Sequence, residues 1–328
     1  MSKQFFMVFI FLIFCFSKAQ VHSLQGKWIL DKIVYQNGSP LEVNHPLYST
    51  FMEYGFSGNN LSVNNYQRFK VTVDSETIST DFRIMNYKIE NEHLTISEKG
   101  DDKVYHFLKL SDFLRRYPEF EPKEIIYNGK KVFGSNAVVK PEFGKFENFE
   151  EFLRINIPSY TSVSATNNFF KARFILTADN KVNDIEIVDG VSEKFDNQFK
   201  TALLRSEKLL KNTYGKDLLV EQTFNFFQMF SPYTTKEERQ ISGLIRKGDD
   251  FYDKNDFENA AAQYVKLLAL NITPETTERF GYKLDQAFIN SGVTLLATGQ
   301  REKACESFIR VGGKTNFKVR NYLINFCN

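Results

Sequence analysis

Cysteine, histidine and proline are scarce in this chain of 328 residues, which contains 3, 4 and 8 of them. The histidines, at positions 22, 45, 93 and 106, stand at no metal-ligand spacing with cysteine or paired carboxylates, so we expect no metal site. The sequence also has no HExxH, no GxSxG and no phosphate-binding glycine-rich loop. These absences argue against an enzyme and predict no cofactor.

Charge of one sign is not in excess either. The chain has 42 Lys and Arg against 40 Asp and Glu. Its first nineteen residues carry two lysines and no acidic residue, which leaves 40 of each in the remainder. A neutral chain offers no electrostatic attraction for nucleic acid or for an anionic membrane surface, so we expect neither as a partner.

Long hydrophobic runs are missing except at the start of the chain. Twelve apolar residues, 5–16, follow Lys3, and Ser17 and Ala19 stand at the −3 and −1 positions of a signal-peptidase site. Twelve residues are too few to span a bilayer, which needs about 20. We therefore predict a cleaved signal peptide at residues 1–19 and an exported protein, periplasmic or secreted, with no transmembrane segment after cleavage.

Two cysteines, Cys305 and Cys327, remain once the signal peptide is removed. In an oxidising compartment, two cysteines near the same end of a chain predict a disulfide. The alternative is a pair of buried thiols that never meet.

The sequence of residues 20–112 predicts an all-β first domain, because many short strands recur between turns with almost no helical periodicity. This pattern is typical of a barrel or a sandwich, and we expect a barrel-like fold. Gly26 and Trp28 lie on the first of these strands, and Asn37-Gly38 predicts the first turn. With its strands at 87–89 and 94–96 and a closing strand at 104–110, this segment resembles the lipocalin-like domains of exported bacterial proteins.

That resemblance implies a structural role for Gly26 and Trp28, since in this family the tryptophan closes one end of an up-and-down barrel. The family often encloses a small apolar ligand, which would make the barrel a carrier. A barrel of this length can equally be filled by its own side chains. Both interpretations are open at this point.

Residues 122–230, after a linker at 113–121, predict an α+β middle domain. Asn128-Gly129 predicts a type I′ hairpin turn, residues 170–176 alternate in polarity, and two amphipathic helices follow the hairpin and the strands. The Pro141–Gly144 motif, the turn at 178–182 and Tyr214-Gly215-Lys216 resemble the C-terminal domain of TonB in a form found in exported proteins of Bacteroidetes-type bacteria. The resemblance implies strand addition by a partner segment at an edge strand, unless neighbouring parts of the chain cover that edge.

The sequence pattern of residues 232–328 predicts an all-α helical repeat. Gly248 and Ala260 occupy the small positions of a repeat whose aromatic positions are filled by Phe251, Phe257 and Tyr264, and Gly292 and Ala304 recur 44 residues later. The pattern resembles a tetratricopeptide repeat, in which small residues mark the close approach of paired helices. The excess over the usual period of about 34 predicts an extended helix over residues 276–296, and a last helix at 317–326 would cap the stack.

A groove in this helical part would place Asp249, Tyr252 and Asp253 on its inner surface. These acids would repel a carboxylate, so a groove here favours a basic or apolar segment. The alternative is that the helices serve only to pack against the rest of the chain.

Taken together, the sequence predicts a multidomain, non-catalytic exported envelope protein that acts as a scaffold or adaptor for protein partners. Strand addition and a helical groove are the two expected modes of binding. The alternative function is a carrier of a small apolar ligand in the first domain.

Overall fold

The computed structural model describes residues 24–65, 67–90, 92–145, 148–163, 169–226, 233 and 235–327, so the predicted signal peptide lies outside the described residues. The chain divides into two compact units. The first, called the barrel unit here, comprises the chain up to Glu121 together with Glu142–Phe149. The second unit comprises Pro122–Pro141 and Glu150–Asn328.

The barrel unit is built on a nine-stranded antiparallel sheet in the order β4-β3-β2-β1-β9-β8-β7-β6-β5. The strands are β1 (Gly26–Tyr35), β2 (Glu53–Ser57), β3 (Asn60–Val63), β4 (Gln67–Lys70), β5 (Thr72–Val73), β6 (Thr77–Ser79), β7 (Ile84–Glu90), β8 (His93–Glu98) and β9 (Lys103–Lys109). The two ends of the sheet, β4 and β5, are separated in the chain only by the buried Val71. The sheet is therefore a nearly closed barrel, as the sequence predicted.

The interior of the barrel is occupied by its own side chains. A contiguous cluster of buried residues from the strands includes Trp28, Tyr54, Leu94 and Phe107. The rings of Tyr54 and Phe107 stack with centroids 4.8 Å apart. This packing is typical of small barrels whose inward-facing residues fill the space between the strands.

A short helix covers part of β1, and residues 113–121, which the sequence predicted to be a linker, form part of this helix and the turn after it. Helix α2 (Leu110–Arg116) and the following 3₁₀ turn, Pro118–Phe120, bury Phe113 and Phe120. The buried carboxylate of Asp31 on β1 accepts hydrogen bonds from the Tyr117 hydroxyl and from the Arg116 guanidinium. The predicted linker is thus a packed part of the barrel unit, because its aromatic residues are buried.

The second unit begins with a five-stranded mixed sheet in the order β10-β11-β16-β13-β14. Its strands are β10 (Glu124–Tyr127), β11 (Lys130–Gly134), β16 (Leu218–Asn225), β13 (Phe169–Leu176) and β14 (Val182–Asp189). The short strand β15 (Leu210–Lys211) of this unit lies outside the sheet, and the short strand β12 (Glu142–Phe143) belongs to the barrel unit. Asn128 and Gly129 both have positive φ angles, as a type I′ turn requires.

Two helices lie between the strands of this sheet in the chain: α3 (Phe149–Asn156) precedes β13, and α4 (Glu193–Ser206) follows β14. Phe195, Phe199 and Leu203 form the buried stripe of α4, and Phe199 contacts Phe170 of β13 with ring centroids 4.7 Å apart. Sheet and helices belong to the same compact unit as the C-terminal helices, so a separate middle domain stays a prediction.

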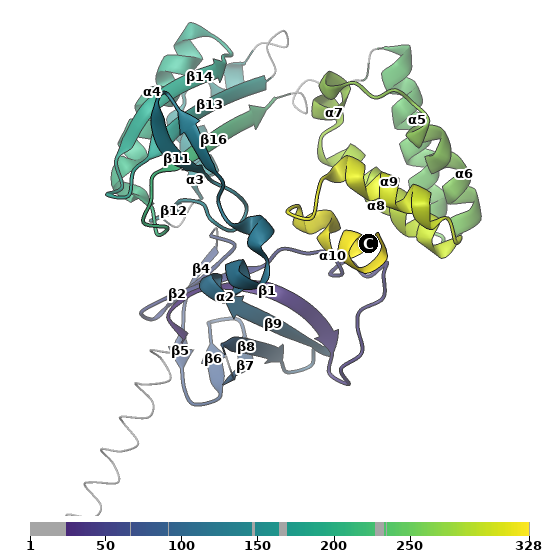
Figure 1. Cartoon of the computed structure of the whole chain (residues 1–328), viewed down its shortest axis with the longest axis horizontal. Helices are drawn as coiled ribbons and strands as arrows, with labels where there is room; N and C mark the ends of the chain where they lie inside the picture. Colours follow the sequence, from purple (N-terminus) through teal and green to yellow (C-terminus); the bar gives the residue numbers. More distant parts are fainter. Residues whose placement is uncertain are drawn as a thin grey trace, which may run out of the picture. The chain divides into compact units, whose positions relative to one another are not determined.

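The C-terminal part consists of α5 (Lys236–Tyr252), α6 (Phe257–Leu268), α7 (Pro274–Phe280), α8 (Tyr282–Ala297), α9 (Arg301–Val311) and α10 (Phe317–Phe326). Two helical hairpins, α5–α6 and α8–α9, repeat with an offset of 44 residues (Figure 1). Their turns match, because Asn255 and Gly299 both have positive φ angles. In each hairpin the ring of one helix lies directly on a glycine of the other.

The predicted extended helix at 276–296 is wrong. The chain forms two helices there, α7 and α8, and they are separated by Gly281. Its φ of 52° and ψ of −130° lie in a region that glycine adopts far more readily than other residues. The additional residues between the hairpins therefore form a separate short helix rather than a longer one.

The predicted last helix and the predicted disulfide are both confirmed. Helix α10 follows α9, and a disulfide joins Cys305 to Cys327, whose Cα atoms lie 5.6 Å apart and whose sequence separation is 22. Closing a loop of this size restricts the unfolded chain and contributes roughly 3 kcal/mol. Within the described residues, no helix has the length and hydropathy needed to cross a membrane.

We predict opposite effects of alanine at two glycines of α5. A Cβ at Gly248 would lie 2.4 Å from the Tyr264 ring, so Gly248→Ala should lower the free energy of unfolding by about 1–3 kcal/mol. At Gly243 a Cβ meets nothing within 4 Å, and Gly243→Ala should raise it by about 0.5–1 kcal/mol. Urea denaturation of the full chain measures both, and equal responses would contradict the close approach at Gly248.

We also predict a loss of stability at alkaline pH that depends on Tyr54. Burial raises the pKa of this phenol from 10.0 to about 12. Between these values the unfolded chain loses the phenolic proton while the folded chain keeps it, so the free energy of unfolding falls by about 2–3 kcal/mol as pH rises from 10 to 12. Tyr54→Phe should remove that part of the loss in urea titrations at pH 9 and pH 11.5, and an unchanged pH dependence would contradict it.

Candidate functional site

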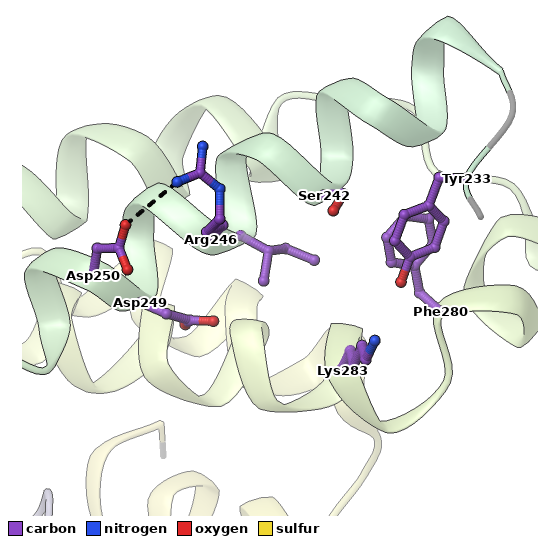
Figure 2. Close-up of a pocket in the computed structure, with 8 residues that line it drawn as sticks. Tyr233, Ser242, Arg246, Asp249, Asp250, Phe280 and Lys283 are labelled. Atoms are coloured by element: carbon purple, nitrogen blue, oxygen red, sulfur yellow. Dashed lines mark ion pairs between the residues drawn. The ribbon is translucent and has the colours of Figure 1, made fainter. Parts of the chain in front are cut away.

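A pocket of about 240 Å³ lies between α5, α7 and α8 (Figure 2). Its lining consists of Tyr233, Ser242, Ile245, Arg246, Asp249, Asp250, Phe280 and Lys283. The five residues from α5 fall at the i, i+3, i+4, i+7 and i+8 positions, so they form one face of that helix. The pocket is thus formed where the first helices of the two hairpins, with α7 between them, present side chains to a common space.

Aromatic rings form one end of the pocket. Tyr233 and Phe280 stack with centroids 4.4 Å apart and an interplanar angle of 4° (Figure 2). The ammonium group of Lys283 lies 6.0 Å from the centre of the Tyr233 ring, at the outer limit of a cation–π contact. This end therefore combines a flat apolar wall with a positive charge.

Asp249 supplies one of the two carboxylates that line the pocket, and residues from two other helices hold it in place. The hydroxyl of Tyr264 on α6 donates to Asp249 Oδ1 over 2.6 Å, and the side-chain amide of Asn290 on α8 donates to the same oxygen over 3.1 Å. Gln286 in turn donates to Asn290 Oδ1 over 2.9 Å. Both donors are neutral, so they orient the carboxylate and leave its negative charge in place.

The environment keeps Tyr264 in its donor form. Its side chain is fully buried, and burial, followed by the hydrogen bond to Asp249, raises the pKa of the phenol well above its ordinary value. A phenol is protonated at physiological pH, and the raised pKa keeps Tyr264 protonated to higher pH than usual. In the described part of the chain, Asp249 Oδ2 receives no hydrogen bond and no ion pair.

Among the described residues that line the pocket, the remaining charged side chains are the ion pair of Arg246 with Asp250 and the cation of Lys283. Arg246 and Asp250 form an i, i+4 ion pair at 3.7 Å, and both side chains are largely exposed (Figure 2). Such a pair contributes little to stability. Lys283 has no carboxylate within ion-pair distance among the described residues.

The three residues predicted to line a groove do not share the pocket. Asp249 lines it, whereas Tyr252 and Asp253 do not. Tyr252 packs edge-on against Phe257 with ring centroids 5.8 Å apart, and its burial raises the pKa of its phenol. Asp253 follows α5 and is exposed. A partner contact by these two residues stays a prediction.

The residues predicted to be structural lie at close approaches or in a core. A Cβ at Gly292 would lie 2.3 Å from the Phe308 ring, the same arrangement as at Gly248, and Ala260 and Ala304 are fully buried. In the barrel, Gly26 has a φ of 110°, and the fully buried Trp28 donates its indole N–H to the Leu24 carbonyl over 2.7 Å.

The sequence did not single out Tyr233, Ser242, Phe280 or Lys283, which line the pocket, or Asn290, which donates to Asp249. A comparison of the two hairpins at their offset of 44 residues shows where the first one differs. Asp249 matches Val293 and Tyr264 matches Phe308, so a polar pair stands where the second hairpin is apolar. That difference was visible in the sequence and would have singled out Tyr264 together with Asp249.

A second pocket, of about 250 Å³, lies between the end of α3 and α4 and is lined by polar residues and a proline: Asn156, Pro158, Asn197, Gln198, Thr201 and Arg205. Comparison with known proteins gives no family assignment, because no family model and no curated protein matches this chain.

We predict that the polar pair of the first hairpin is not needed for folding. Asp249→Val alone leaves the buried Tyr264 hydroxyl without its acceptor, which costs about 1–3 kcal/mol. The double variant Asp249→Val/Tyr264→Phe reproduces the second hairpin and should recover that loss. Thermal unfolding of the two variants and the wild type measures the effect. A double variant no more stable than the single one would mean that packing requires the polar pair.

Proposed function

We propose that this protein is an exported, non-catalytic binding protein whose helical part holds a segment of a protein partner. The observation that carries the proposal is the pocket between α5, α7 and α8. It contains a carboxylate fixed by two neutral donors, with one oxygen left without a partner in the described residues. The proposal includes the cleaved signal peptide, and the disulfide between Cys305 and Cys327 fits the oxidising compartment that export would give.

The pocket suits a short segment better than a folded surface or a large ligand. Its volume of about 240 Å³ is small beside the roughly 300–1,000 Å³ of typical small-molecule sites. One or two side chains of an extended segment would fill it. The resemblance of the two hairpins to tetratricopeptide repeats supports the same mode, because such repeats use the inner face of their first helices to hold peptides.

The irregular backbone of the edge strand β14 argues against strand addition at this edge, the other predicted binding mode. Its register with β13 shifts twice, and Asp184 within it has a φ of 51°. Lys130 of the β10–β11 hairpin also forms an ion pair with Asp184 at 2.6 Å. Bulges and charges on an edge strand hinder pairing with another chain.

The filled interior of the barrel argues against the alternative function, a carrier of a small apolar ligand. Trp28, Tyr54 and Phe107 are among the side chains that occupy its interior. A carrier would retain its ligand on purification. A native mass spectrum showing a mass excess that disappears on denaturation would therefore favour the carrier over the binding protein.

The test of the proposal compares captured proteins between matched variants. We expect full-length wild-type protein, cross-linked in the envelope of the expressing cell, to retain a partner that the Asp249→Val/Tyr264→Phe variant retains at least tenfold less. Glu258→Gln, an exposed change on α6 outside the pocket, is the control and should behave as wild type. Quantitative mass spectrometry of the cross-linked material measures this. The same proteins at the same levels in all three samples would refute the proposal.

A further inference from the structure

We infer that the pocket selects a segment of mixed charge, with a lysine or arginine side chain placed against Asp249 and a carboxylate placed against Lys283. The inference rests on the proposed function and adds the chemistry of the partner segment. Three observations carry it: the internal repeat, the unused charges of the pocket, and its apolar wall.

The internal repeat shows that the packing of a hairpin does not require the carboxylate. In the second hairpin, Val293 and Phe308 take the places of Asp249 and Tyr264, and both are buried. The ring of Phe308 lies over Gly292 as the ring of Tyr264 lies over Gly248. Asp249 is half-buried, so the first hairpin places a carboxylate where the second hairpin buries valine. We attribute its presence to a cation that completes the site.

The hydrogen bonds of Asp249 leave room for that cation. Tyr264 and Asn290 both donate to Oδ1, and neither brings a positive charge. Tyr264 is neutral at physiological pH, as any phenol is, and its raised pKa extends that neutral range to higher pH. Asp249 Oδ2 is the remaining acceptor, and an ammonium or guanidinium group is the donor that pairs with a carboxylate most strongly.

Lys283 limits which segments can enter. The Arg246–Asp250 pair has no net charge, so among the described residues that line the pocket the charges outside an ion pair are one anion, on Asp249, and one cation, on Lys283. A purely basic segment would place a second cation near Lys283, and a purely acidic one would place an anion near Asp249. Discrimination of this kind uses repulsion as well as attraction.

The apolar wall suits the remainder of a basic side chain. Ile245 and the stacked rings of Tyr233 and Phe280 line the pocket beside the charged groups. Lysine and arginine carry aliphatic stems that pack on such surfaces while their charged ends reach a polar partner. A basic side chain therefore contacts both kinds of group that the pocket offers.

The experiment uses the full-length protein and an array of acetylated, amidated decapeptides with randomised positions for Lys, Arg, Asp, Glu and Gln. Wild-type protein should bind peptides that contain both a basic and an acidic residue at least tenfold better than peptides with glutamine at those positions. Asp249→Asn keeps the shape of the side chain and should abolish the preference for a basic residue. Lys283→Met should abolish the preference for an acidic one, and Lys283→Glu should convert the selection to purely basic peptides.

The outcomes separate this inference from the proposed function. Selective binding that follows these variants supports both. If wild-type protein binds peptides but shows no preference for charge, or if Asp249→Asn keeps the preference for basic residues, the inference is wrong and the binding function stands. If no peptide binds, the proposed function fails and the inference fails with it. Competition by free lysine as strong as by a bound peptide would also overturn the inference, since the site would then be one for a small amino compound.

Discussion

The close approach of paired helices is the constraint on which the helical part depends. At Gly248 and at Gly292 an aromatic ring occupies the space where any larger residue would place its Cβ. This contact fixes the rotation of α5 about its axis. Since successive helical residues are about 100° apart, seating the Tyr264 ring on Gly248 determines that Asp249 turns toward α8 and the pocket. The same contact that packs the hairpin therefore positions the carboxylate.

Much of this architecture could be predicted from the sequence, because its signals are local. The spacing of Gly248, Ala260, Gly292 and Ala304 reports a contact between helices that are adjacent in the chain, and the glycine turns of the barrel report tight connections between neighbouring strands. The break at Gly281 could not be predicted with the same rules. Ten additional residues allow a longer helix as readily as a separate one, and only the left-handed backbone of Gly281 decides between them.

The pocket could be predicted only in part, because several of its contacts join residues that are far apart in the sequence. Asp249 stands out on the inner face of a predicted helix, but Asn290 is 41 residues away and meets it through the packing of α8 against the first hairpin. Phe280 and Lys283 lie on either side of Gly281, so their positions depend on the break that the sequence did not reveal. An extended helix at 276–296 would have continued through this point with no end at Phe280 and no new start at Tyr282.

Comparison of the two hairpins shows that the first has a polar pair where the second has apolar packing. The second hairpin reaches the same close approach with Val293 and Phe308, so an apolar solution to this packing problem exists within the chain itself. The first hairpin instead buries the Tyr264 hydroxyl and directs it at a carboxylate that packing does not need. Proteins depart from locally consistent packing mainly at functional sites. In the first hairpin the departure lies beside a pocket, and this is why we assign binding to that pocket rather than to the filled barrel or the irregular edge strand.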